Sequence, residues 1–194
     1  MDEKEYWDRI LKDAGFTSRQ VSRFDADGRL EPLKDKERWC SSHLLMALHN
    51  LDAASVMRNS KPPKLGDYFQ TFSDWVVTIS YYAMYQACLS LLAYTGRKSE
   101  SHKATITAVA NYFYHSQKLL SPEDMKLIAG ISQKLENADI RSVIEEKKKR
   151  EEATYGIGLD WANAIADEAL ANAKGFVAKT RVLLQQAGIG IEDI

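Results

Sequence analysis

Apolar residues recur at helical spacing along most of the chain, and no segment alternates apolar and polar positions between hairpin turn signals. The first such segment places Tyr6, Trp7 and Ile10 on one side of a short helix. The pattern therefore predicts an all-α fold. The expected helices cover about 3–14, 35–59, 73–95, 102–115, 121–138, 141–155 and 158–187.

Turn and cap residues set the expected ends of these helices. Gly15 is placed to end the first one, and residues 16–34 predict a loop with at most one helical turn. Ser73 or Asp74 is the expected N-cap of the central helix. Ser121, followed by a proline and two acidic residues, marks the start of another helix.

The central segment from Trp75 to Gly96 holds 22 residues without a formal charge. That length could cross a bilayer, which needs about 20 apolar residues. Hydroxyl and amide side chains interrupt it throughout, however, as expected for the buried central helix of a soluble bundle. We expect the second reading, with four side chains of this helix in the core: Tyr81, Tyr82, Met84 and Tyr85.

The expected architecture is an up-and-down bundle of about five main helices. Residues 1–34 form a short helical N-terminal extension, residues 35–187 the bundle, and residues 188–194 a C-terminal tail. A chain of 194 residues is long enough to bury one sizeable core.

Composition and charge favour a cytoplasmic protein with no preferred partner class. The net charge is −1, so no overall positive field attracts nucleic acid. Cys40 and Cys88 lie in separate expected helices and read as reduced core residues. The acidic start lacks the pattern of a signal peptide.

Motifs for metals and cofactors are missing from the sequence. The four histidines have no metal-binding spacing, and no glycine-rich phosphate loop or nucleophile elbow occurs, so we expect no metal and no cofactor. The charged run 145–152 pairs opposite charges four residues apart, which is typical of a solvated helix face.

Three segments resemble the HEPN family of all-α domains: SYYAMYQACLSLLAYTGRKSESHKA at 80–104, KKKREEATYG at 147–156 and AKGFVAKTRVLL at 173–184. HEPN domains occur in prokaryotic toxin–antitoxin and defence systems and beside minimal nucleotidyltransferases. The resemblance implies a HEPN-like bundle that forms a homodimer. It is greatest to the branch with the Tyr-Tyr-Ala-Met-aromatic run.

Active members of that family are metal-independent ribonucleases that use an arginine and a histidine four to six residues apart. A histidine can move the proton of a 2′-hydroxyl, and an arginine can stabilise charge on phosphate. Arg97 and His102 match this spacing, but the family places the motif near the last long helix. There, Lys148 and Ala153 stand at the arginine and histidine positions.

Because Ala153 stands where the family motif has its histidine, we rank two expectations for function. The first is a non-catalytic HEPN module that binds a nucleotide, RNA or a partner protein such as a minimal nucleotidyltransferase. Its expected ligand-binding residues are Lys148, Arg150 and Tyr155. The alternative is a HEPN endoribonuclease, a toxin, with Arg97 and His102 as its catalytic residues.

Overall fold

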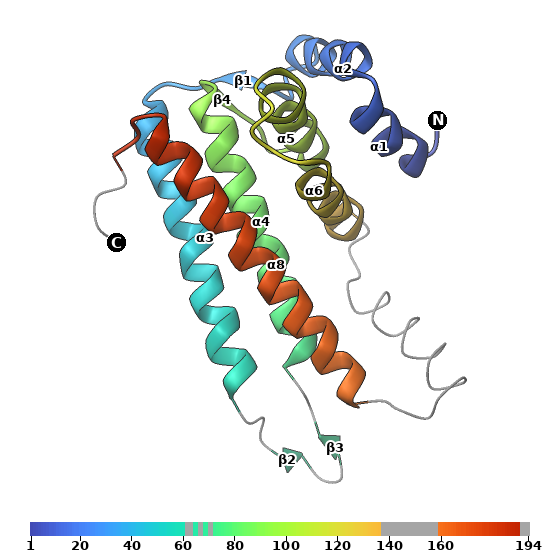
Figure 1. The fold of residues 1–194 in the computed structure, drawn as a ribbon, viewed down its shortest axis with the longest axis vertical. Helices are drawn as coiled ribbons and strands as arrows, with labels where there is room; N and C mark the ends of the chain where they lie inside the picture. The colour runs from blue at the N-terminus through green and yellow to red at the C-terminus, as the bar shows by residue number, and fades with distance from the viewer. Residues whose placement is uncertain (61–63, 66–67, 70–71, 137–158, 191–194) are drawn as a thin grey trace.

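Long helices lie side by side and form the body of the protein in the computed structural model (Figure 1). The structure describes residues 1–60, 64–65, 68–69, 72–136 and 159–190. In these residues the helices are α1 (Glu3–Lys12), α2 (Ala14–Ala26), α3 (Lys36–Asn59), α4 (Ser73–Tyr94), α5 (His102–Val109), the π-helix η1 (Ala110–Ser116), α6 (Pro122–Glu136) and α8 (Leu159–Gln186). The two-residue strands are β1 (Glu31–Pro32), β2 (Lys64–Leu65), β3 (Tyr68–Phe69) and β4 (Arg97–Lys98).

The prediction of an all-α fold is confirmed. Each expected helix among the described residues is present within a few residues of its expected ends. The expected helix over 141–155 lies outside the described residues. Two antiparallel strand pairs, β1 with β4 and β2 with β3, are too short to form a separate layer.

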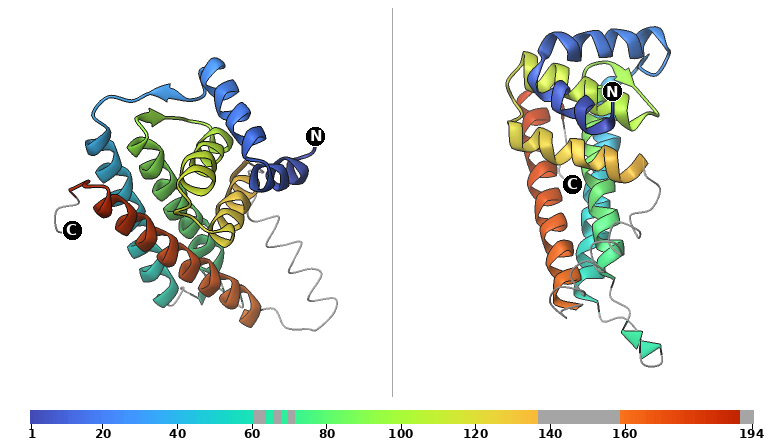
Figure 2. Two further views of the ribbon diagram at one scale, coloured as in Figure 1. Left: turned by 45° about the horizontal axis from the view of Figure 1, so that its top comes forward. Right: turned by 90° about the vertical axis from the view of Figure 1, so that its right-hand side faces the viewer.

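Helix α4 is the centre of the bundle. It packs against α3 and α8 on one side and against α5 and α6 on another, and α1 and α2 lie outside α5 (Figures 1 and 2). Val76, Met84 and Leu91 of α4 are fully buried. One described helix, α4, is long and apolar enough to cross a membrane, and 72% of its most apolar window is buried inside the protein. Such burial fits the central helix of a soluble bundle.

Helix α2 is a correction to the expected loop over 16–34. Asp13 caps this helix by accepting a hydrogen bond from the backbone N–H of Phe16 at 2.8 Å. Helix α1 therefore ends at Lys12 and α2 begins at Ala14. Gly15 lies in the first turn of α2, so the prediction that it ends the first helix is wrong. Asp13 is a typical N-cap residue, but it was not recognised as one because Gly15 was interpreted as the end of a helix.

Buried polar contacts hold the N-terminal helices on the bundle. The hydroxyls of Tyr6 and Thr107 are 2.9 Å apart, and His115 Nε2 donates to the carbonyl of Ile10 at 2.7 Å. Tyr6, Trp7 and Ile10 also belong to the same hydrophobic core as α4. The division of the chain at residue 34 stays a prediction, although α1 shares this core.

The predicted helix start at Ser121 is confirmed, whereas the predicted cap at Ser73 or Asp74 is not. Ser121 Oγ accepts from the backbone N–H of Asp124 at 3.2 Å, and the Asp124 carboxylate accepts from the N–H of Ser121 at 2.7 Å, which confirms this start. The expected cap at Ser73 or Asp74 is wrong, because Phe72 occupies the cap position. Ser73 Oγ instead donates to Asn163 Oδ1 of α8 at 3.0 Å.

The assignment of Tyr82 to the core is also wrong. Tyr81, Met84 and Tyr85 are buried as expected, whereas Tyr82 is 45% exposed. Successive helical residues are about 100° apart, so Tyr82 points about 160° away from Met84. Helix α4 therefore has one open side.

Leu91→Asp and Tyr82→Asp test this assignment as a matched pair. Leu91 has no exposed surface, and a carboxylate there would be buried without a partner, at a cost of several kcal/mol. We expect Leu91→Asp to be insoluble or to lack cooperative unfolding. Tyr82→Asp should stay soluble, helical and cooperatively unfolding by circular dichroism. Loss of the fold in both variants would contradict an open side of α4 at Tyr82.

Candidate functional site

Arg97 lies on β4 and is engaged in an ion pair with Asp25 of α2. Its guanidinium carbon lies 6.0 Å from the ring centroid of Tyr112, and its side chain is 29% exposed. An arginine that binds a phosphate transition state must direct its N–H groups to the ligand. Here a carboxylate of the protein already accepts from Nη1.

His102 is the first residue of α5 and packs its ring on Tyr85. The two ring centroids are 4.1 Å apart, with 39° between the planes. Tyr85 is buried, and this burial raises the pKa of its hydroxyl. Arg97 thus faces Asp25, and His102 faces an aromatic ring of the central helix. The other expected ligand-binding residues, Lys148, Arg150 and Tyr155, lie outside the described residues.

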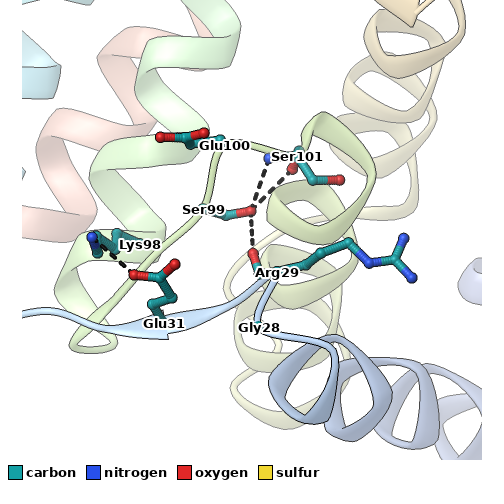
Figure 3. A pocket seen from close by; sticks show the side chains of 7 residues that line it. All are labelled: Gly28, Arg29, Glu31, Lys98, Ser99, Glu100 and Ser101. Carbon is teal, nitrogen blue, oxygen red and sulfur yellow. Dashed lines mark hydrogen bonds and ion pairs between the residues drawn. The ribbon is translucent and has the colours of Figure 1, made fainter.

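A surface pocket of about 370 Å³ lies beside β1 and β4 (Figure 3). The charges around it balance, because two cations, Arg29 and Lys98, and two anions, Glu31 and Glu100, line it. Lys98 Nζ is 2.9 Å from Glu31, and Arg29 is 2.7 Å from Asp27. Its cations are therefore already occupied, and the pocket has no net charge that would attract an anion.

Ser99 joins the β4 side of this pocket to the chain segment that follows α2. Its hydroxyl donates to the carbonyl of Arg29 at 2.6 Å and accepts from the backbone N–H of Ser101 at 3.1 Å (Figure 3). Leu33 N–H donates to the carbonyl of Gly96 at 2.8 Å next to it. These bonds connect the chain before α3 to the chain before α5, which is a structural role.

The described residues contain no group of three or more histidine, cysteine, aspartate or glutamate side chains that could hold a metal ion. Cys40 and Cys88 are free and buried, as predicted. Burial raises the pKa of the Cys40 thiol to about 11 and raises that of Cys88 further, so neither is a reactive thiolate at neutral pH.

The open side of α4 carries large side chains and no formal charge. Trp75, Tyr82 and Leu89 recur every seven residues, and Ile79 and Gln86 lie between them. Trp75 and Tyr82 are 47% and 45% exposed. Ser73, which bonds to α8, lies about half a turn from Tyr82, so this side faces away from α8.

Helix α3 continues this surface beside α4. Its Trp39 and Met46 are 45% and 49% exposed. His43 Nδ1 donates to Gln86 Oε1 at 2.8 Å and joins the two helices. We call the combined surface the uncharged face. It comprises Trp39, His43, Met46, Asn50, Ala53 and Met57 of α3 with Trp75, Ile79, Tyr82, Gln86 and Leu89 of α4.

The uncharged face is large enough for a stable protein contact. Helix α4 has 22 residues and is about 33 Å long, and two helices about 10 Å wide cover roughly 660 Å². A standard interface buries about 800 Å² on each partner. Specific interfaces begin at about 600 Å² on each partner, so this area is sufficient.

A small, mostly apolar pocket of about 90 Å³ lies at the β4 end of the uncharged face. Trp39, His43 and Leu89 belong to both the pocket and the face, and Leu33 and Leu92 add apolar walls. Arg97, Lys98 and Ser99 line its β4 side. This volume fits one apolar side chain. Pockets that take one side chain at the edge of an apolar contact are typical anchors of protein interfaces.

Sequence reasoning missed Asp25 and the direction of the uncharged face. Asp25 fell within the expected loop over 16–34, and that prediction gave it no position relative to Arg97. The seven-residue spacing of Trp75, Tyr82 and Leu89 was the available signal for the face. A helix that is apolar on nearly every side hides that signal.

Comparison of the chain with family models, with curated proteins and with solved structures finds no match.

A double-mutant cycle measures how firmly Asp25 holds Arg97. We expect Asp25→Asn and Arg97→Met to be coupled by about 1 kcal/mol in urea unfolding, at the upper end for partly exposed pairs. Glu31→Gln and Lys98→Met are the control, because both side chains of that pair are more than half exposed and should show no measurable coupling. A coupling near zero between Asp25 and Arg97 would mean that Arg97 is available to a ligand.

Proposed function

We propose that this chain is a non-catalytic, HEPN-like binding module that works as a homodimer. The uncharged face carries the proposal. Soluble monomers rarely expose apolar patches larger than about 300–600 Å², and such patches mark protein contacts. A face without formal charge fits a second apolar surface better than a phosphate-rich ligand.

A second copy of the chain is the partner that the face fits best. In a two-fold contact the same patch meets itself, so each residue must tolerate its own chemistry on the other side. A face with lysines or glutamates would repel its copy, whereas aromatic, aliphatic and amide side chains do not. Aromatic residues and methionine are also enriched in interfaces, and Trp39, Met46, Trp75 and Tyr82 supply both.

The binding role follows from the resemblance together with the state of Arg97. A HEPN-like dimer in a prokaryotic toxin–antitoxin or defence setting would bind a nucleotide, RNA or a partner such as a minimal nucleotidyltransferase. Lys148, Arg150 and Tyr155 are the proposed contacts. The ribonuclease alternative needs Arg97 to bind phosphate, and the Asp25 ion pair argues against it.

Neighbouring residues of α3 test the dimer directly. Met46 lies on the uncharged face, and Leu45, 40% exposed, lies outside it. The parent chain should have about twice its 21.9 kDa mass in light scattering at micromolar concentration. Met46→Asp should weaken association at least about 30-fold, because the carboxylate would be desolvated in the contact. Leu45→Asp should stay dimeric.

The parent as a folded monomer would contradict the proposed dimer. Equal loss of association in Met46→Asp and Leu45→Asp would place the contact elsewhere.

RNA cleavage in EDTA tests the non-catalytic role. We expect no cleavage by the parent, by His102→Ala or by Arg97→Ala, each first shown to be folded and dimeric. Removal of a general acid–base group typically lowers the rate about 10²–10⁴-fold. Cleavage by the parent that both substitutions abolish would establish the ribonuclease alternative instead.

A further inference from the structure

An apolar pocket of about 250 Å³ opens where the ends of α4, η1 and α8 meet. Leu91, Phe113 and Leu184 line it and are almost fully buried, with 0–2% of their surface exposed. Leu119, on the chain after η1, lies at its edge and is 42% exposed. The pocket thus combines a buried apolar interior with access from solvent.

Two unusual backbone features form one wall of the pocket. The π-helix η1 carries Phe113 and is followed by its C-cap Gln117, whose N–H donates to the carbonyl of Tyr112 five residues earlier, at 3.0 Å. Lys118 then adopts a positive φ of 58°, a left-handed conformation that is strained for a non-glycine residue. Both π-helices and strained backbone occur preferentially at functional sites.

The end of α8 forms the opposite wall in a similar way. Gly188 has a φ of 79°, and Ile189 N–H donates to the carbonyl of Leu184 at 3.0 Å. Leu120 and Ile189, which follow the two positive-φ residues, turn into the core. The chain thus turns at Lys118 and at Gly188, and each turn places one apolar side chain in the core. The pocket lies between these two turns.

Charge and polarity define what the pocket would accept. None of its lining residues is aspartate, glutamate, lysine, arginine or histidine, so a charged ligand would lose water without gaining a partner. The rings of Tyr94 and Phe113, with centroids 6.2 Å apart, offer contacts to a flat molecule. The side-chain amides of Gln117 and Gln186 line the exposed edge and can donate or accept one hydrogen bond each.

We propose that this pocket binds a small uncharged molecule with a flat apolar body and one hydrogen-bonding group. An engineered apolar cavity of about 150 Å³ in another protein binds benzene, so about 250 Å³ has room for two fused rings. The polar edge favours a small molecule over a peptide, which needs apolar surface beyond a single pocket. The proposal is independent of the dimer, since Leu91 lies about half a turn of α4 away from Tyr82.

Indole is a suitable probe, and methyl NMR of the full chain reports where it binds. Titration should shift the methyl signals of Leu119, Leu183 and Leu184 in a saturable way. Val182 of α8 and Leu127 of α6, both outside the pocket, should not respond. Indole-3-acetate, which adds a carboxylate to the same rings, should bind at least about 10-fold more weakly.

Ala187→Trp and Ala178→Trp form a matched pair for the same titration. Both alanines are exposed, but Ala187 lines the pocket and Ala178 does not. Ala187→Trp should fill the pocket and weaken indole binding at least about 10-fold, while Ala178→Trp should bind like the parent.

Four results would overturn the proposal. They are the absence of saturable shifts up to the solubility limit of indole, equal shifts at Val182 and Leu127, equal affinity for indole-3-acetate, and unchanged affinity in Ala187→Trp.

Discussion

The absence of charge on α4 after Asp74 in its first turn is the constraint on which the rest of the structure depends. Twenty-two residues from Trp75 to Gly96 carry no formal charge, so burial must cover nearly every side of this helix. Helices α3 and α8 cover one side, and α5 and α6 cover another. The side with Trp75, Tyr82 and Leu89 stays open, and we propose that a second copy of the chain covers it.

The N-terminal helices pack on the other side of α4, where they hold Arg97, one residue of the pair that resembles a catalytic motif. Helix α2 brings Asp25 to Arg97, and α1 is held on α5 and η1 by Tyr6 and by the carbonyl of Ile10. The same attachment that extends the core therefore neutralises the arginine. We therefore propose that function depends on contacts made by exposed surfaces and not on chemistry at Arg97.

Local signals in the sequence predicted local structure well. The helix start at Ser121, with its following proline and acidic residues, and the long apolar segments placed most described helices correctly. The prediction failed where the outcome depended on distant partners. Asp13 ends α1 and caps α2, whereas the nearby Gly15 suggested only a helix end. Ser73 bonds to Asn163 of α8 instead of capping α4. Tyr82 was misplaced because a helix with apolar residues on all sides does not indicate which side is buried. Asp25 became a site residue only through a contact 72 positions away along the chain.

Intermolecular contacts in solution give the most direct test of the uncharged face as a dimer interface. A mixed sample of labelled and unlabelled chains, measured by isotope-filtered NMR, detects proton contacts between two copies only. The account predicts such contacts from the methyl groups of Met46, Ile79 and Leu89 and from the ring of Tyr82. Val182, which is 49% exposed on α8, should show none. Contacts from Val182 without any from Tyr82, or no contacts at all at concentrations where the chain is folded, would contradict it.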